Sequence, residues 1–234
     1  MKKIITMLCC LGCLLWTVSC GRDSINEEPI VQEEENNGSN NGSNEDENGS
    51  GGGNTPGDSI GKILIAYFSR AGENWNVGYV DRGNTAVMGD YIKELTSGDV
   101  FEIEPETSYP TNYQEMLQVS NHETETNARP AIKNKLENLD QYDVVFIGSP
   151  IWHGNPPMIM RTFYEAYPGL ADKTLVAFGT HGGSGISSCS RLIREYFPNA
   201  VQLESYGISG ERIRDEQSKE NVRAWLQRIG ILPD

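Results

Sequence analysis

From residue 60 onward, short apolar runs alternate with segments whose apolar residues recur at helical spacing. The runs cover residues 62–68, 100–103, 143–148 and 174–179, with a weaker fifth run at 200–203. Runs that are apolar nearly throughout are typical of strands buried on both faces of a sheet. The segments with helical periodicity are 86–95, 158–164, 192–197 and 222–229. Strands that alternate with helices predict βαβ units.

Right-handed crossovers between such units predict an α/β fold: a doubly wound, five-stranded parallel sheet with helices on both faces, in three layers. Residues 60–234 would form one domain of this kind, which is long enough to bury roughly 70% of its unfolded surface. Ligands of such sheets bind beyond the carboxyl ends of the strands. The functional residues are therefore expected in the loops after the first, third and fourth strands.

The first 20 residues have the pattern of an export signal. Lys2 and Lys3 precede an apolar stretch, residues 4–18, that is shorter than the roughly 20 apolar residues of a membrane span. Small residues then precede Cys20, which resembles the lipobox of bacterial lipoproteins and implies a lipid on that cysteine. The expected location is outside the cytoplasm, on a membrane of the bacterial cell envelope. An ordinary signal peptide cut nearby and an uncleaved anchor are the alternatives.

Residues 21–59 are expected to be a disordered acidic linker rich in Gly, Asn and Ser. They hold ten acidic residues and one basic residue, and their few aliphatic side chains cannot offset the cost of ordering the backbone. The whole chain has a net charge of −14, and residues 60–234 account for −7 of it. Because phosphate neutralisation needs clusters of Lys and Arg, this balance argues against nucleic acid as a partner.

Three loops after predicted strands carry residues suited to a ligand. The first is Ser69-Arg70-Ala71-Gly72, continued after eleven residues by Asn84-Thr85 at the start of a helix, where backbone N–H groups favour a phosphate. The second, residues 149–157, places Trp152 among Pro and Gly, which favours an exposed aromatic plane. The third is the Gly-rich turn 180–185, whose backbone can approach a ligand closely.

Together these loops resemble the flavodoxin family across essentially all of residues 60–234. The residues that carry the resemblance are Tyr67 to Gly72, Gly83-Asn84-Thr85, Gly148 to Trp152, and Gly179 to Gly185. It implies a non-covalently bound FMN. By the same resemblance the phosphate would be held by Ser69, Arg70, Ala71, Gly72, Asn84 and Thr85. One side of the flavin ring would be flanked by Pro150, Ile151, Trp152, His153 and Gly154, and the other edge by Thr180, His181, Gly182 and Gly183.

Two features depart from the family pattern. The phosphate turn is split by residues 73–83, and Ala71 stands where the family has Thr. The insertion is either a bulge near the flavin or a block in the phosphate pocket. His181 occupies a position for a small residue, where it would either donate to the flavin or point to solvent.

Other chemistries fit the sequence less well. Residues 122–126 begin like a zinc-protease helix but lack its second His, and the domain has only three His and Cys189, so no metal is expected. Ser184 lies in a near match to a nucleophile elbow, yet its expected role is to cap the following helix. Cys189 is expected on that helix, half-buried and inert.

The favoured function is therefore electron transfer through FMN, with redox proteins or small-molecule acceptors as partners and no catalytic side chain. Two alternatives stay open. One is an FMN-dependent reductase of quinones or similar acceptors that uses a reduced nucleotide. The other is a flavin-free binding module on the same fold, because a fold does not determine its function.

Overall fold

A computed structural model of the chain describes residues 61–234. The expected export signal, its Cys20 and the expected linker, residues 21–59, lie outside the described residues. None of the helices within 61–234 combines the length and the apolar character that crossing a membrane requires.

The main sheet is parallel, as predicted. The chain passes from β1 outward to β4 and then crosses to β5 on the other side of β1, so the strand order reverses at β1. From β5 the sheet continues to β6 and then to an edge made of two short strands, β7 and β8, which both pair with β6. The strands are β1 (Ile63–Tyr67), β4 (Asp99–Glu102), β5 (Val144–Pro150), β6 (Thr174–His181), β7 (Val201–Gln202) and β8 (Tyr206–Ser209).

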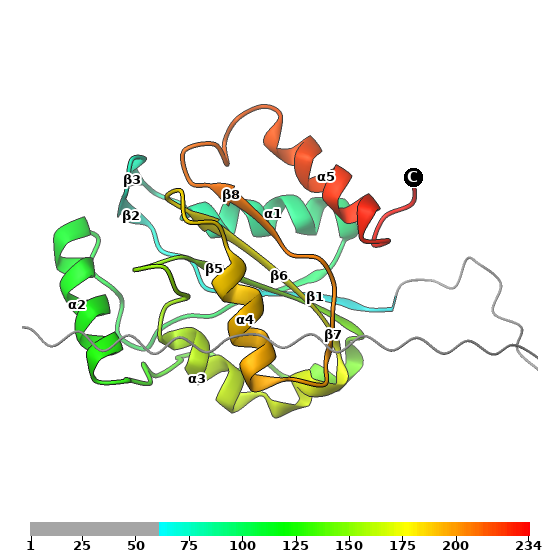
Figure 1. Ribbon diagram of the computed structural model, residues 1–234, viewed down its shortest axis with the longest axis horizontal. Helices are drawn as coiled ribbons and strands as arrows, with labels where there is room; N and C mark the ends of the chain where they lie inside the picture. Colours follow the sequence, from blue (N-terminus) through cyan, green and yellow to red (C-terminus); the bar gives the residue numbers. More distant parts are fainter. Residues whose placement is uncertain (1–60) are drawn as a thin grey trace, which may run out of the picture. The chain divides into compact units, whose positions relative to one another are not determined.

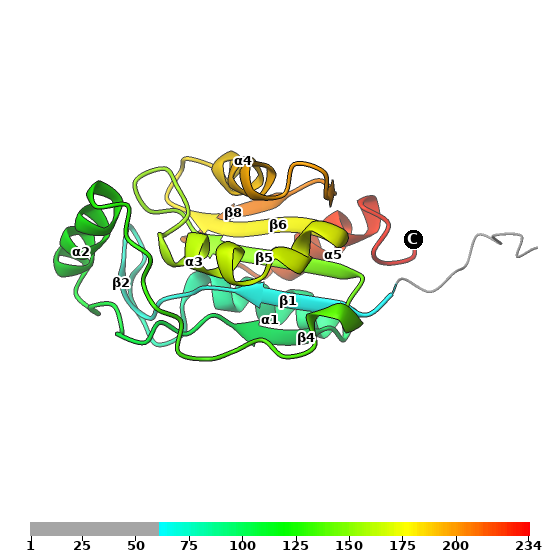
Figure 2. The same cartoon turned by 90° about the horizontal axis from the view of Figure 1, so that it is seen from below.

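Helices cover both faces of the sheet and complete three layers (Figure 1). Helices α1 and α5 lie on one face and α3 and α4 on the other, as Figure 2 shows from below. The helices are α1 (Asn84–Thr96), α2 (Tyr113–Glu125), α3 (Ile159–Ala166), α4 (Ser187–Tyr196) and α5 (Ser218–Arg228). The predicted fold is therefore confirmed, and α2 differs from the other helices because it lies at one end of the sheet (Figure 1).

The core divides along the sheet because successive side chains of a strand point to opposite faces. Leu64 and Ala66 of β1 pack in the cluster that contains Phe163 of α3. Ile63 and Ile65 pack instead with the buried Trp225 of α5. This alternation holds β1 between the two helical layers and fixes where its carboxyl end lies.

Two local features were not predicted. The fifth strand is interrupted after Gln202 and resumes at Tyr206, so its second half pairs with the carboxyl end of β6. The inserted residues form an antiparallel hairpin of β2 (Gly72–Asn74) and β3 (Gly78–Val80). Both features lie at the end of the sheet where ligands of this fold class bind.

Candidate functional site

The carboxyl ends of β1, β5 and β6 meet at one edge of the sheet, beside the point where the strand order reverses. A cavity of about 130 Å³ lies there. It is lined by Asn74, Trp75, Asn84, Tyr113, Met116, Leu117, Pro150, Ile151, Trp152, His153, Thr180, His181, Gly182 and Gly210. This is the position at which open α/β sheets bind their ligands.

The start of α1 offers free hydrogen-bond donors near this cavity. The first N–H groups of a helix have no acceptor within the helix. Ser69 Oγ accepts from the Ala86 N–H at 3.0 Å, so it satisfies one of them. The N–H groups of Asn84 and Thr85 have no acceptor among residues 61–234. With the positive end of the helix dipole, they favour an anion.

The inserted hairpin leaves the turn after β1 and rejoins the chain next to the same turn. A Cβ built on Gly83 would lie 2.2 Å from Ser69 Oγ, so only glycine fits where the chain comes back to β1. The two halves of the split turn, Ser69 to Gly72 and Gly83 to Thr85, are therefore adjacent in space. Of the two alternatives for the insertion, this arrangement favours the bulge beside the cavity.

Arg70 lies in the first loop, but its guanidinium donates to carbonyl groups outside the cavity. The residue is buried, and Nη1 donates to the carbonyls of Pro110 at 2.7 Å and Thr111 at 3.2 Å. Nη2 donates to the Glu73 carbonyl at the start of the hairpin. The side chain therefore ties three loop segments together and does not line the cavity.

A different cation lies at the start of α1. Arg214, from the segment before α5, donates to Asn84 Oδ1 and, at 2.6 Å, to the Arg82 carbonyl. Its charge is placed beside the helix end that favours an anion. Sequence reasoning missed this residue, because it lies 130 positions from Asn84.

Trp152 forms one wall of the cavity, at a turn held by reciprocal hydrogen bonds between Trp152 and Asn155 of 2.8 and 3.0 Å. His153 and Gly154 have φ angles of 49° and 79°, as in the type I′ turn. The indole is half-buried, edge-to-face with Phe68 at 5.6 Å and Tyr109 at 5.0 Å. The expected exposed plane is thus corrected: contacts with the core hold the ring in place while it lines the cavity.

Trp75 is a second aromatic at the cavity. It lies at the hairpin turn, is 58% exposed, and its ring is 6.0 Å from that of Tyr113 on α2. A Cβ built on Gly182 would lie 2.9 Å from Trp75 Cδ1, so the indole reaches the loop after β6. The hairpin thereby adds an aromatic edge to the site.

The loop after β6 is shaped by hydrogen bonds within it and to α1. The hydroxyls of Thr180 and Thr85 are 2.9 Å apart and buried. His181 Nδ1 accepts from the Gly183 N–H at 3.0 Å, so this nitrogen carries no proton. Partial burial lowers the pKa of His181 below its usual 6.5 and keeps the ring neutral near pH 7.

The structure brings together most of the predicted residues. Those that line the cavity are Asn84, Pro150, Ile151, Trp152, His153, Thr180, His181 and Gly182. Those outside the lining are Ser69, Arg70, Ala71, Gly72, Thr85, Gly154 and Gly183. Ser69 and Thr85 still contact the start of α1 or the wall residue Thr180 through their hydroxyls.

Helix α2 supplies cavity residues that sequence reasoning missed. Tyr113, Met116 and Leu117 line the cavity and follow the i, i+3, i+4 spacing of one helix face. This spacing was the available sequence signal, but nothing local indicates that this face meets the end of the sheet rather than solvent.

The other candidate residues have structural roles. Cys189 lies on α4 and is fully rather than half buried, and burial raises the pKa of its thiol to about 11. The prediction that Ser184 caps α4 is wrong, because the helix starts at Ser187 without a side-chain cap and the Ser184 hydroxyl donates to the Gly185 carbonyl. Within residues 61–234, no group of three or more His, Cys, Asp or Glu side chains is placed to hold a metal.

Comparison with known proteins identifies the class. A family model described as Flavodoxin matches residues 62–229, so the chain belongs to the flavodoxin family. The predicted resemblance is confirmed, and with it FMN as the cofactor of this family. Among curated protein sequences, no significant match was found.

Solved structures agree with this assignment. A protein described as a flavoprotein from Bacteroides eggerthii is 33% identical over 72% of this chain and 98% of its own, with a TM-score of 0.57. A similarly described protein from Bacteroides uniformis is 29% identical over 71% of this chain and 98% of its own, also with a TM-score of 0.57. A Lactobacillus acidophilus flavoprotein in complex with FMN shares the fold at 19% identity, covering 68% of this chain and 99% of its own, with a TM-score of 0.50.

The residues at the cavity fit FMN chemically. The unpaired N–H groups of Asn84 and Thr85 suit a phosphate, and Arg214 adds a positive charge. Trp152 and Trp75 offer aromatic surface for a flat ring. Thr180 and Gly182 of the loop after β6 add polar backbone at the same cavity.

Proposed function

We propose that this protein binds FMN at the described cavity and acts as an electron carrier held at a bacterial envelope membrane by a lipid on Cys20. The observation that carries the cofactor assignment is the juxtaposition of free N–H donors at the start of α1 with two tryptophans at the same edge of the sheet. Bound FMN supplies one- and two-electron transfer, and the protein's contribution is binding, orientation and electrostatics.

The phosphate end of the site is assigned to the start of α1. Asn84 and Thr85 donate through their N–H groups, and the Arg214 guanidinium balances the negative charge. Ser69 keeps the helix end in place by accepting from Ala86. Arg70, Ala71 and Gly72 contribute through the path of the backbone; for Arg70 this follows from the three carbonyls that its guanidinium already contacts.

The ring end is assigned to the two turns beyond β5 and β6. Trp152 offers its face, and Pro150, Ile151 and His153 line the same wall. Thr180, His181 and Gly182 border the other edge of the flavin ring. Gly154 and Gly183 have positive φ angles, which the two turns beside the ring require. Trp75, which also lines the cavity, adds a second aromatic surface for the ring.

Membrane attachment rests on the sequence of residues 1–59. In this proposal the export signal ends at Cys20, and residues 21–59, rich in Gly, Asn and Ser, join the lipid-bearing residue to the domain. The charge of −7 on residues 60–234 steers the domain towards partners with basic surfaces. Redox proteins of that kind, or small-molecule acceptors, are the proposed partners.

A comparison of FMN with riboflavin tests the phosphate assignment. FMN is expected to bind about 10- to 100-fold more tightly, because charge-assisted hydrogen bonds to a phosphate are worth about 1.5–3 kcal/mol. Arg214→Gln should reduce this ratio, whereas Arg223→Gln on the exposed face of α5 should leave it unchanged. Equal binding of the two flavins would show that the start of α1 does not hold the phosphate.

Turnover assays separate a carrier from a reductase. A carrier is expected to accept electrons from a reduced partner without oxidising NADH or NADPH by itself. Sustained oxidation of either nucleotide by the purified protein with a quinone would support the reductase instead.

A further inference from the structure

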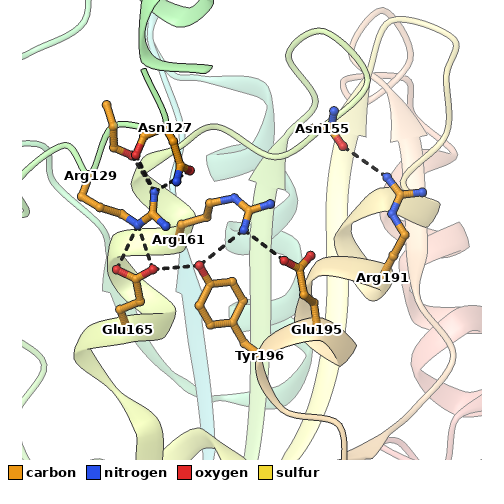
Figure 3. A network of polar contacts seen from close by, with 9 residues as sticks. Asn127, Arg129, Asn155, Arg161, Glu165, Arg191, Glu195 and Tyr196 are labelled. Atoms are coloured by element: carbon orange, nitrogen blue, oxygen red, sulfur yellow. Dashed lines mark hydrogen bonds and ion pairs between the residues drawn. The ribbon is translucent and has the colours of Figure 1, made fainter. Parts of the chain in front are cut away.

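A second cavity, of about 210 Å³, lies next to the candidate cofactor site. It is bounded by α2, by α3 and the residues before it, and by α4. Trp152 and His153 line both cavities, so the turn that carries them separates the two. Figure 3 shows two arginines at this place: Arg161 on α3, and Arg191 on α4, which reaches the turn at Asn155.

One part of the cavity lining is apolar. Pro156, Pro157 and Met158 lie in the segment before α3, and Leu192 lies on α4. Together with the Trp152 indole they present apolar surface, and the two prolines and the tryptophan in it have little rotamer freedom to lose. Such surface favours an apolar group, and an aromatic group can also stack on the indole.

The two arginines have donors to spare. A guanidinium has five N–H donors. Arg161 uses only Nη1, in long contacts of 3.3 Å to Glu195 and 3.4 Å to the Tyr196 hydroxyl. Arg191 uses only Nη2, at 3.2 Å from Asn155 Oδ1. The other guanidinium nitrogens of both residues have no acceptor in the part of the chain that the structure describes.

Arg129, also drawn in Figure 3, uses more of its guanidinium donors than Arg161 and Arg191 do. Its Nε donates to both carboxylate oxygens of Glu165 at 2.8 and 2.9 Å, and its Nη1 donates to the carbonyl and side chain of Asn127. Arg129 does not line the cavity. It therefore has a structural role, whereas Arg161 and Arg191 retain donors at the cavity.

Two serine hydroxyls add hydrogen-bonding capacity at the cavity. Ser120 on α2 and Ser188 on α4 line the cavity and are only 4% and 6% exposed. Neither hydroxyl has a hydrogen-bond partner among residues 61–234, and neither oxygen is among the fully buried polar atoms. Each hydroxyl therefore keeps its hydrogen-bonding capacity for a ligand in the cavity.

We propose that this cavity binds a small organic anion: a carboxylate on a flat apolar body. Arg161 and Arg191 hold the carboxylate, Ser120 and Ser188 complete its hydrogen bonds, and the apolar walls cover the body. Glu195 is the one acidic residue in the lining, so the two guanidiniums leave an excess positive charge. The inference rests on these side chains and does not require FMN.

Benzoate is the probe, titrated into the purified full chain without flavin and followed by calorimetry. Saturable binding is expected, and Arg191→Gln should weaken it about 10- to 100-fold, since a hydrogen bond to a charged group is worth that much. Arg191 is exposed, so this variant keeps the fold. Arg161→Gln should act in the same direction, and Arg129→Gln, the matched control, should bind benzoate like the unaltered protein.

Two further probes separate the contribution of the ligand's charge to binding from that of its apolar body. Benzamide, which has the same shape without the charge, should bind at least tenfold more weakly than benzoate, and inorganic phosphate should bind more weakly because it leaves the apolar walls uncovered. No saturable binding of benzoate, equal binding of benzoate and benzamide, or full affinity in Arg191→Gln would each overturn the proposal.

Discussion

Replacing Trp152 with alanine removes the aromatic wall that the account assigns to the flavin ring. If the ring covers ~60–80 Å² of the indole face, burial at about 25 cal/mol/Å² contributes roughly 1.5–2 kcal/mol. Offset stacking adds about 0.5–1.5 kcal/mol. Trp152→Ala is therefore expected to weaken FMN binding by about 2–3.5 kcal/mol, which is roughly 30- to 400-fold in Kd. Titration of FMN, followed by quenching of flavin fluorescence, measures this.

Two control variants make the result interpretable. Trp152→Phe keeps an aromatic face and should recover most of the affinity. Tyr79→Ala removes another aromatic residue, 63% exposed on the hairpin and outside the cavity lining, and should leave the Kd unchanged. Because Trp152 also packs on Phe68 and Tyr109, urea unfolding must show that the alanine variant is folded at the assay temperature. A folded Trp152→Ala protein that binds FMN within threefold of the unaltered chain would refute the stacking assignment.

Three other changes test separate parts of the account. Arg70→Met should lower the free energy of unfolding in urea by about 1.5–3 kcal/mol, because it removes a buried charged donor from the half-buried carbonyl of Pro110. An unchanged unfolding midpoint would contradict the role of Arg70 in holding these loops together. The free energy of unfolding should fall as the pH drops below 6.5, because the unfolded chain takes up a proton that His181, with its lowered pKa, resists. This contribution to the slope should be absent in His181→Gln. FMN affinity should fall at lower pH, below the lowered pKa of the folded protein, because protonation of Nδ1 there breaks its bond with Gly183. Cys20→Ala should move the protein from the detergent-rich to the aqueous phase in a detergent partition; unchanged partition would refute the lipid anchor.

Much of the fold was predictable because buried parallel strands carry a local signal. The runs at 62–68, 143–148 and 174–179 are apolar on both faces, and they coincide with β1, β5 and β6. The edge strand was less clear, since a strand with only one neighbour needs fewer apolar residues. Its division into β7 and β8 follows from pairing with β6, which residues 200–209 alone do not reveal.

The candidate site likewise has a part that the sequence predicted and a part that it did not. The loops after β1, β5 and β6 were found because topology fixes where those strands end. The contributions of Arg214 and of α2 come from contacts between segments far apart in the chain, which leave no local pattern. The contacts of the Arg70 guanidinium could not be predicted for the same reason: its acceptors include the Pro110 carbonyl, which lies 40 positions away in the chain.

The central claim is that the described cavity holds FMN, and the absorption spectrum of the purified full chain tests it most directly. The account predicts either a bound chromophore with flavin bands that is released on denaturation, or an apoprotein that takes up added FMN with one saturable site. A colourless protein that leaves the absorption and fluorescence of added FMN unchanged would contradict it.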